Sequence, residues 1–320
     1  MSRKHIKTEA TGRGMSVIVR KGDLNKALRI LKKRLTEDGV LQDYKAKQFY
    51  EKPSEKRKRE KAAGRARWMK QNKKLVWITG ASSGIGKELC YKFSQENWDV
   101  ALTARRKDKL VKITKEIGSN NTICPANVAD KSEVEQAFNK LLKSHNKIDL
   151  AILNAGIYKS VSCKNFNSKI FKDHIEINYM GVVNSLEKII PKMIQQGYGH
   201  IAILTSPTGW RGLPKAAAYG PTKSALKNLA ESLKFELEPL GIKIQLFCPG
   251  FVETEATPVG EHSLPGIISA RKAANLIFNS LKSNYFEVFI PNNFVIWCLY
   301  ILKFLPEKLA HRLIKWRTGY

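Results

Sequence analysis

A glycine-rich segment follows the first strongly apolar stretch of this chain and is suited to binding phosphate. Leu75–Ile78 is typical of a buried strand and runs directly into Thr79-Gly80-Ala81-Ser82-Ser83-Gly84-Ile85-Gly86. Glycines let a pyrophosphate approach the backbone, and the N-terminus of a following helix favours the anion. A glycine pattern in this strand–loop–helix context predicts a dinucleotide-binding loop. The predicted cofactor contacts in the loop are Gly80, Ser82, Ser83, Gly84, Ile85 and Gly86.

The end of the second predicted strand indicates which dinucleotide this loop binds. An enzyme that uses NAD places a carboxylate about 20 residues after the glycines, where it binds the ribose hydroxyls. Here the residue after Thr103 is Ala104, and Arg105 and Arg106 follow it. A missing acid and an added guanidinium favour a 2′-phosphate, which predicts NADP (NADPH) over NAD with Arg105 as the phosphate contact. In the alternative interpretation, both arginines are only the solvated start of a helix.

A serine, a tyrosine and a lysine form a second group with chemical potential. Tyr219 and Lys223 are four residues apart, so they lie on one face of a helix. Ser206 precedes Tyr219 by 13 residues and closes the predicted strand His200–Leu204. Each residue also has an ordinary interpretation: a strand-end hydroxyl, a packed aromatic ring and a solvated lysine. The surrounding motifs decide between the two.

Those motifs occur in a particular order along the chain. Leu153-Asn154-Ala155-Gly156 and then Asn178 precede Ser206, and Pro249-Gly250-Phe251-Val252-Glu253-Thr254 comes after a later predicted strand. With the glycine loop and the Ser206, Tyr219 and Lys223 group, they resemble the short-chain dehydrogenase/reductase family over about residues 73–290. The resemblance implies an oxidoreductase that interconverts a carbonyl and an alcohol by hydride transfer with a nicotinamide cofactor.

The resemblance also implies a role for each matching residue. Tyr219 is the acid/base, and since an unperturbed tyrosine has a pKa of about 10, the Lys223 ammonium and the oxidised nicotinamide must favour its phenolate. Lys223 also contacts the nicotinamide ribose, Ser206 hydrogen-bonds the substrate oxygen, and Asn178 holds a water that relays protons to Lys223. The further cofactor contacts are Asn127, Asn154, Ala155, Gly156, Pro249, Gly250, Val252 and Thr254.

The chain departs from the family pattern at two positions. Leu153 replaces an asparagine that is more frequent there, and Asn127 replaces the aspartate that commonly holds the adenine. Because an asparagine side chain both accepts and donates hydrogen bonds, Asn127 is kept as a predicted cofactor contact.

Alternating strand and helix patterns are expected to position these groups. The candidate strands are 75–79, 99–103, 122–126, 149–153, 200–204, 243–247 and 286–290, with helical stretches between them. One of the helices is predicted to open with a capping box at Ser132 and Glu135. Short apolar strands that alternate with helices predict an α/β fold, a doubly wound parallel seven-stranded sheet of the Rossmann type.

The composition of the chain changes at Lys74. Residues 1–74 contain 24 Lys+Arg and 8 Asp+Glu, a net charge of +16, out of +28 for the whole chain. A charge this large implies nucleic acid, an anionic membrane or both as partners. Within the basic leader, residues 1–72, a helix capped by Asp23 and stopped by Gly39 is predicted. A short helix over 42–50 and a basic helical stretch over 54–67 follow.

The leader has a pattern more specific than its charge. Its motifs are Met15-Ser-Val-Ile-Val-Arg, Ala27-Leu28-Arg29, Leu31-Lys32-Lys33, Gly39-Val40-Leu41 and the segment Phe49-Tyr50-Glu51-Lys52-Pro53-Ser54-Glu55-Lys56-Arg57-Lys58-Arg59. They resemble small-subunit ribosomal protein twenty-one of bacteria, which implies helices laid on small-subunit ribosomal RNA. The implied RNA contacts are Lys32, Lys33, Arg34, Tyr50, Lys56, Arg57, Lys58 and Arg59. The alternative is a solvated charged tail without a specific partner.

The chain ends in an apolar stretch, Phe294–Pro306, and an amphipathic basic stretch, Glu307–Trp316. Three alternatives fit this pattern: peripheral contact with a membrane by residues 294–317, a cap over an apolar substrate pocket, or an oligomer contact. Each alternative favours a small apolar or lipid-like carbonyl or alcohol substrate over a sugar.

Other features limit the class of protein. The five cysteines, Cys90, Cys124, Cys163, Cys248 and Cys298, include no C-x-x-C pair, which fits a reducing cytoplasm and not a disulfide framework. The histidines form no metal-ligand pattern, so no metal is expected. The first 16 residues lack the apolar core of a signal peptide. The apolar run Phe294–Leu302 is shorter than the ~20 residues that cross a membrane.

The sequence therefore predicts a fusion of four parts: an extension (1–14), a ribosomal-protein-like RNA-binding segment (15–72), an NADP-binding short-chain dehydrogenase/reductase domain (73–291) and a C-terminal cap (292–320). The predicted location is cytoplasmic, on ribosomes or at a membrane surface, and the resemblance implies a homodimer or tetramer of the enzyme half. In a rival hypothesis the chain is a structural constituent of the small ribosomal subunit and the reductase is a passenger. In another, the enzyme is translated separately, from a start such as Met69.

Overall fold

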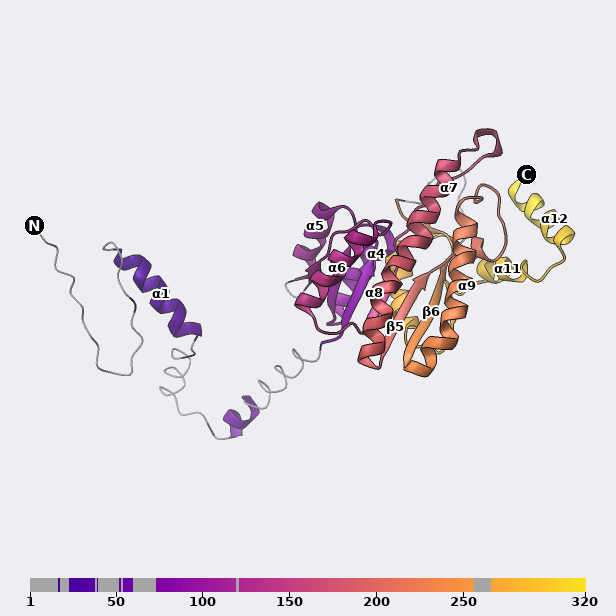
Figure 1. The fold of residues 1–320 in the computed structure, drawn as a ribbon. Helices are drawn as coiled ribbons and strands as arrows, with labels where there is room; N and C mark the ends of the chain where they lie inside the picture. The colour runs from indigo at the N-terminus through magenta and orange to yellow at the C-terminus, as the bar shows by residue number, and fades with distance from the viewer. Residues whose placement is uncertain are drawn as a thin grey trace, which may run out of the picture. The chain divides into compact units, whose positions relative to one another are not determined.

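The computed structural model describes residues 23–37, 54–59, 73–118, 121–255 and 266–320, together with residues 17, 39 and 52. The chain divides into two compact units, residues 1–72 and 73–320 (Figure 1). The boundary between the units lies next to the change of composition at Lys74.

Within the described residues of the second unit, seven strands form one parallel sheet in the order β3-β2-β1-β4-β5-β6-β9. They are β1 (Leu75–Thr79), β2 (Asp99–Thr103), β3 (Thr122–Ile123), β4 (Leu150–Leu153), β5 (Gly199–Leu204), β6 (Ile242–Pro249) and β9 (Glu287–Ile290). The predicted doubly wound parallel sheet is confirmed, although β3 is shorter than predicted. The strand order reverses between β1 and β4, and ligands of open α/β sheets bind at the carboxyl ends of such neighbouring strands.

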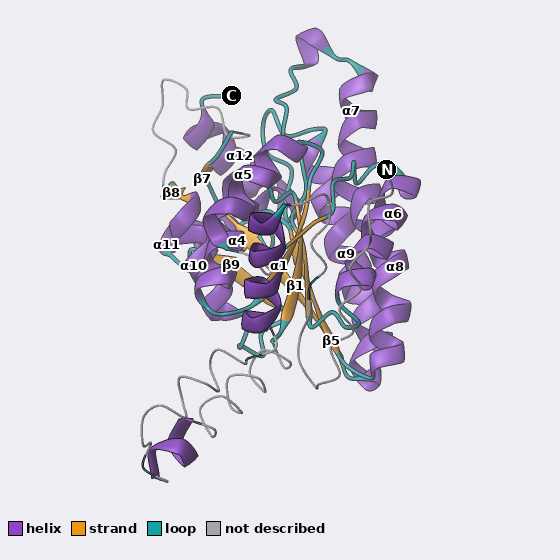
Figure 2. Ribbon diagram, turned by 90° about the vertical axis from the view of Figure 1, so that its left-hand side faces the viewer, coloured by secondary structure: helices purple, strands orange, loops and turns teal. Residues whose placement is uncertain are grey.

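Helices cover both faces of the sheet (Figure 2). One layer holds α4 (Gly84–Gln95), α5 (Lys107–Ile117) and α10 (Ala270–Ser280), and the other holds α6 (Lys131–Ser144), α8 (Gly181–Gln196) and α9 (Tyr219–Leu237). Successive strand residues point to opposite faces, so Trp77 enters the core with Phe138, while Ile78 enters the other core with Phe93. Strand β1 is therefore buried along its whole length.

The start of α6 differs from the prediction. Asp130 is the N-cap, and its Oδ1 accepts hydrogen bonds from the backbone amides of Ser132 (2.8 Å) and Glu133 (3.1 Å). The predicted capping box at Ser132 and Glu135 is therefore wrong, because Ser132 already lies inside the helix. A carboxylate two residues earlier is the stronger acceptor at the positive end of a helix.

Shorter elements complete the second unit. They are α7 (Ser168–His174), the π-helix η2 (Ile175–Met180), the 3₁₀ turns η1 (Cys163–Asn165), η3 (Pro207–Gly209) and η4 (Glu238–Leu240), the paired strands β7 (Val252–Glu253) and β8 (Ile268–Ser269), and the helices α11 (Phe294–Ile301) and α12 (Glu307–Thr318). The helices α11 and α12 follow β9, the edge strand of the sheet, and form the end of the chain (Figure 1).

The described part of the leader contains α1 (Leu24–Glu37) and a helical segment at residues 54–59. Asp23 Oδ1 accepts a hydrogen bond from the Lys26 amide (2.9 Å), and Gly39 has a φ of +73°. The predicted cap and stop of the first helix are therefore confirmed. The predicted helix at 42–50, Tyr50 and residues 60–67 lie outside the described residues.

Candidate active site

The glycine loop joins β1 to α4 at the carboxyl edge of the sheet. Gly80 and Gly84 have φ values of +70° and +54°, in the left-handed region that favours glycine. A Cβ on Gly86 would lie 2.3 Å from the Gly80 carbonyl oxygen, so the backbone is packed too closely for any side chain. The bare backbone at the N-terminus of α4 fits a pyrophosphate, as the sequence predicts for a dinucleotide.

Asn154, at the end of β4, holds the glycine loop in shape. Its Nδ2 donates to the backbone carbonyl oxygens of Thr79 (3.0 Å) and Gly80 (3.3 Å). The Thr79 hydroxyl in turn accepts hydrogen bonds from the amides of Asn154 (3.1 Å) and Ala155 (3.2 Å). A Cβ on Gly156 would lie 3.3 Å from Asn178 Oδ1. The Asn154-Ala155-Gly156 segment is therefore braced against the loop on one side and the Asn178 side chain on the other.

Arg106 turns its side chain toward the glycine loop, whereas Arg105 is exposed. The Arg106 Nη2 donates to the hydroxyls of Ser82 (3.0 Å) and Ser83 (2.8 Å), two of the predicted cofactor contacts. Its Nη1 donates to the Glu255 carboxylate at 2.9 Å. The phosphate contact of Arg105 stays a prediction, and Arg106 is the arginine whose side chain lies against the loop.

The Glu255 carboxylate bridges two cations beside this loop. One oxygen pairs with Arg106 and the other with Lys109 Nζ, each at 2.9 Å. Hydrogen bonds from Lys109 and Arg106 lower the pKa of Glu255 to about 2. Lys109 is not among the predicted cofactor contacts, although its position three residues after Arg106 places both on one helical face.

Tyr219, Lys223 and Ser206 meet where β5 and α9 approach each other. Tyr219 is the first residue of α9, and Lys223 Nζ lies 5.4 Å from the centroid of its ring. The buried Lys223 Nζ donates to the carbonyl oxygen of Leu204 (2.8 Å), which is the last residue of β5 and lies two residues before Ser206. The Ser206 hydroxyl accepts a hydrogen bond from the Thr208 hydroxyl (3.1 Å). The structure therefore brings together the three side chains that the sequence grouped.

Burial controls the protonation of this pair. Burial raises the pKa of Tyr219, and a hydrogen bond with Ser206 partly opposes this rise. Burial also lowers the pKa of Lys223 to about 8. Both shifts have the same cause, because a site shielded from water disfavours the charged form of each group. In the described structure both groups are therefore shifted toward their neutral forms.

Asn178 lies in the π-helix η2, a type of helical irregularity that is frequent at functional sites. Its amide exchanges hydrogen bonds with the backbone of Ile157 (2.7 and 3.0 Å) and donates to the Thr222 hydroxyl (3.3 Å). One turn earlier, the buried His174 donates from Nδ1 to Ile170 O (2.7 Å) and accepts at Nε2 from the Lys159 amide (3.1 Å). The two side chains hold the 157–159 segment, and the proton relay through Asn178 stays a prediction.

The 249–254 segment lies over the glycine loop and under α11. A Cβ on Gly84 would lie 3.0 Å from the Thr254 methyl, and one on Gly250 would lie 2.5 Å from Ile296 Cδ1. Pro249 ends β6, and the buried Val252 lies in β7. These four predicted cofactor residues therefore lie in one segment between the loop and the C-terminal helices.

Asn127 shapes a turn in this structure. Its backbone amide donates to Glu133 Oε2 (2.8 Å), and its Oδ1 accepts from the Ala129 amide at 3.3 Å. The predicted contact of Asn127 with an adenine stays a prediction.

Trp210 and Glu287 connect helix α9 to the C-terminal helices, a link that the sequence did not predict. Its Nε1 donates to Glu287 Oε1 (2.6 Å), and the other Glu287 oxygen pairs with Lys227 of α9 at 2.5 Å. The Trp210 ring packs against Phe289 (4.9 Å between centroids) and Tyr300 (5.1 Å). The only sequence signal is Lys227, which extends the Tyr219 and Lys223 face by one more turn.

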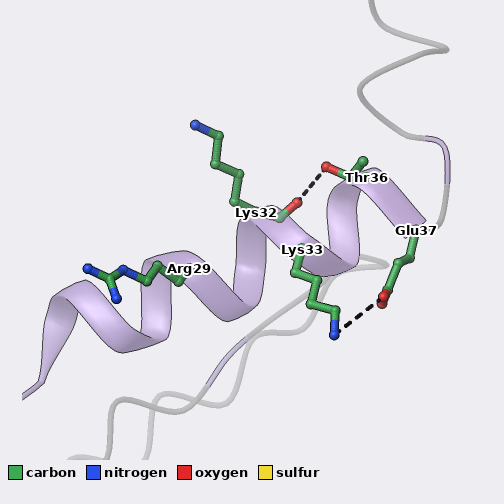
Figure 3. A pocket seen from close by; sticks show the side chains of 5 residues that line it. All are labelled: Arg29, Lys32, Lys33, Thr36 and Glu37. Atoms are coloured by element: carbon green, nitrogen blue, oxygen red, sulfur yellow. Dashed lines mark hydrogen bonds and ion pairs between the residues drawn. The ribbon is translucent and has the colours of Figure 1, made fainter. Parts of the chain in front are cut away.

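The described basic side chains of the leader lie on α1 and on the helical segment 54–59. Figure 3 shows Arg29, Lys32 and Lys33 on α1, with the Lys33 Nζ 3.7 Å from Glu37 Oε1. Arg34 and the run Lys56–Arg59 also lie in described helical residues. Exposed cations on a helix with little buried surface are typical of a nucleic-acid contact or of a solvated face.

Comparison with known families decides what kind of enzyme the second unit is. Residues 74–262, more than half of the chain, match the sequence model of the family described as short chain dehydrogenase. The chain belongs to the short-chain dehydrogenase family. This short-chain dehydrogenase is accordingly an NAD(P)-dependent oxidoreductase, as its sequence motifs predict.

Similar curated proteins are oxidoreductases from several organisms. An uncharacterized oxidoreductase of Staphylococcus epidermidis is 30% identical over 195 residues, which cover 60% of this chain and 85% of that protein. A 3-oxoacyl-[acyl-carrier-protein] reductase of the same species is 32% identical over 58% of this chain and 77% of its own length. Human dehydrogenase/reductase SDR family member 7 is 27% identical over 72% of this chain and 74% of its own length.

Solved structures of the family share the fold of this short-chain dehydrogenase. An alcohol dehydrogenase from Thermococcus sibiricus, complexed with 5-hydroxy-NADP, has a TM-score of 0.62 at 25% identity and covers 68% of this chain and 96% of its own. A serine dehydrogenase complexed with NADP+ has a TM-score of 0.63 at 20% identity, over 69% of this chain and 96% of its own. A 3-ketoacyl-(acyl-carrier-protein) reductase from Brucella melitensis is complexed with NADH. The solved structures that resemble this chain therefore include complexes with NADP and complexes with NADH.

The leader has a family match of its own. Residues 16–69 match the family model of ribosomal protein S21. The predicted fusion of an S21-like leader with a short-chain dehydrogenase is therefore confirmed at the level of family membership.

Proposed function

We propose that the enzyme half interconverts an apolar carbonyl compound and its alcohol with NADP(H). The convergence of Ser206, Tyr219 and Lys223 beside the glycine loop carries this proposal. When bound, the nicotinamide supplies or accepts the hydride. The Ser206 hydroxyl orients the substrate oxygen and stabilises the charge that develops on it. The Tyr219 hydroxyl gives its proton to that oxygen in reduction and recovers it in oxidation.

An aromatic side chain beside the catalytic tyrosine supports an apolar substrate. The Tyr158 ring meets the Tyr219 ring edge to face, with 5.2 Å between centroids. Such a ring buries apolar groups of a substrate.

We expect the enzyme to prefer NADPH to NADH because of the cations at the glycine loop. Charge-assisted hydrogen bonds to a phosphate contribute ~1.5–3 kcal/mol, about 10–150-fold in affinity. Arg106→Ala should remove most of this preference by raising the KM for NADPH. Initial rates with both dinucleotides measure the preference for each variant.

The matched control for this measurement is Arg105→Ala. It removes the neighbouring guanidinium, whose side chain is exposed, and it should leave a larger part of the preference. A rise in the KM for NADH in the Arg106→Ala variant would instead indicate damage to the loop through Ser82 and Ser83. Equal use of NADPH and NADH by the wild type would contradict the proposed phosphate site.

We propose in addition that the leader binds small-subunit ribosomal RNA, as its match to ribosomal protein S21 favours. Lysines and arginines that neutralise phosphates release counterions, so affinity falls steeply with salt. Lys32, Lys33 and Arg34 on α1 and Lys56–Arg59 on the next helical segment are the proposed contacts within the described residues. The RNA contact of Tyr50 stays a prediction.

The leader proposal predicts a specific loss of RNA affinity. Replacing Lys56, Arg57, Lys58 and Arg59 by glutamate in the full chain should reduce binding to small-subunit RNA and flatten its log–log salt dependence by several units. The matched control replaces four exposed lysines of the enzyme half, Lys112, Lys115, Lys143 and Lys282, by glutamate. Equal effects of the two sets in a filter-binding titration would show that net charge alone causes binding.

Two alternatives concern how the halves are used in the cell. In the first alternative, the enzyme half is a passenger on the ribosome. Its complete set of proposed catalytic residues disfavours this hypothesis. Separate translation from Met69 is tested by the mass of the enzyme in cell extract, since the full chain has a mass of 36.2 kDa. The homodimer or tetramer implied by the family stays a prediction.

A further inference from the structure

Helix α11 exposes a continuous apolar stripe. Phe294, Trp297, Cys298 and Ile301 are all exposed and follow each other at the spacing of one helical face. The opposite side is buried: Ile296 is 3% exposed and packs with Trp210 and Cys248. One side of α11 is thus bound to the enzyme, and the other presents only apolar side chains.

Helix α12 carries a second exposed apolar stripe and adds positive charge. Its buried positions are Ala310 and Ile314, whereas Leu309, Leu313 and Trp316 form an exposed stripe. Phe304, in the turn before α12, is 66% exposed. Residues 292–320 contain five Lys and Arg but a single acid, Glu307. The cations are Lys303, Lys308, Arg312, Lys315 and Arg317.

The two helices hold a large share of the exposed apolar surface. Eight of the 18 large hydrophobic side chains that are exposed in the described residues lie within 294–320. Single exposed hydrophobic residues are normal on a protein surface, but apolar side chains that contact one another, as the rings of Trp297, Tyr300 and Phe304 do, mark an interaction site. We name the exposed apolar side chains of 294–316 and their flanking cations the C-terminal face.

The charge pattern indicates what the C-terminal face contacts. A second copy on a two-fold axis would bring the cations of both copies together, since each side of such an interface is the same patch. A bilayer with anionic lipids complements the cations, and the interface region accommodates Trp and Phe rings beside them. No helix among the described residues is long and apolar enough to cross a bilayer, so contact at the surface is the mode that fits.

We propose that the C-terminal face docks the enzyme on the surface of an anionic lipid bilayer. The docking does not require the proposed reaction. One consequence of the docking does rest on the proposed function: apolar substrates reach the active site from the lipid. Tyr300 packs 5.1 Å from Trp210, and Arg211 Nη2 donates to the Leu305 carbonyl oxygen at 2.9 Å. The docking helices therefore adjoin the segment that follows Ser206.

Cosedimentation of the full chain with lipid vesicles tests this proposal. The vesicles contain phosphatidylglycerol and phosphatidylcholine, and high salt suppresses the electrostatic binding of the leader. We expect the Phe294→Ser/Trp316→Ser variant to lose about tenfold or more in partitioning, because each exposed aromatic side chain would otherwise be buried in the interface. In low salt the leader contributes to both proteins alike, so Lys308→Glu/Arg312→Glu/Lys315→Glu should lower the dependence on phosphatidylglycerol relative to that of the wild type.

A matched control separates this face from general surface hydrophobicity. Phe294 and Trp316 are 82% and 81% exposed, and Phe235 and Tyr285, far from them in sequence, are 82% and 76% exposed. Phe235→Ser/Tyr285→Ser should leave partitioning within about twofold, since it removes similar exposed surface outside the patch. Circular dichroism confirms that each variant is folded.

Two results would overturn the docking proposal. One is equal partitioning of the two double variants at high salt. The other is unchanged partitioning of Phe294→Ser/Trp316→Ser together with dissociation of an oligomer in sedimentation velocity, which would assign the face to a second copy of the chain. Because vesicle binding is measured without turnover, an enzyme that reduces no ketone leaves this test intact.

Discussion

Tyr219→Phe is expected to reduce turnover by about 10²–10⁴-fold, the usual contribution of general acid–base catalysis. The substitution removes the only hydroxyl of the side chain and keeps the ring, which packs edge to face on Tyr158. Dinucleotide binding should change little, because the glycine loop and Lys223 remain. Stopped-flow kinetics measures the chemical step, and fluorescence titration measures cofactor affinity.

The matched control is Tyr158→Phe. Tyr158 has the same side chain, lies next to Tyr219, and belongs to a segment held by backbone hydrogen bonds at Ile157 and Lys159. The Tyr158→Phe variant should retain most of the wild-type activity. A Tyr219→Phe variant that keeps more than about a tenth of the wild-type rate would refute the catalytic assignment, since a lost proton donor costs more.

Gly86→Ala is expected to abolish dinucleotide binding and to lower the melting temperature. Its Cβ would lie 2.3 Å from the Gly80 carbonyl oxygen and 2.5 Å from Asn154 Nδ2. Both neighbours are fixed, because Asn154 is already hydrogen-bonded to Thr79 and Gly80. The loop must therefore open to admit one methyl group, which destroys its fit to a pyrophosphate. Fluorescence titration and thermal unfolding by circular dichroism measure the two effects.

Gly212→Ala is the control for the glycine loop. A Cβ on Gly212 would have no atom within 4 Å, although the residue lies only six positions after Ser206. This variant should keep both dinucleotide affinity and melting temperature. If Gly86→Ala also bound NADPH normally, the loop assignment would fail.

The sequence predicted the sheet well because its signal is local. Each strand is a short apolar run between helical patterns, and the register then follows from parallel pairing. The shorter β3 and the Asp130 cap were missed for a related reason. Where strands end and which of several nearby acceptors caps a helix depend on side-chain positions that the pattern does not contain.

The sequence likewise predicts one part of the candidate site and not the other. The grouping of Ser206, Tyr219 and Lys223 follows from spacing and from strands that end at one edge of the sheet. The ion pairs of Glu255 with Arg106 and Lys109, and of Glu287 with Lys227, join residues 60 or more positions apart. No periodicity in the sequence connects such residues, so only the folded chain shows that Arg106 and not Arg105 turns toward the loop.

The position of β1 also matters while the chain is being made. β1 is the first strand of the sheet to be synthesised, yet it lies between β2 and β4, and the pairing with β4 begins only with Leu150. Until then Leu75–Thr79 can pair only with β2 and its other edge has no partner, and an uncharged apolar segment with an open edge is prone to aggregate. Charges that flank such a segment oppose self-association. Residues 1–74, with a net charge of +16, immediately precede it, so the strand that must wait longest for its second neighbour is also the one next to the most concentrated charge of the chain.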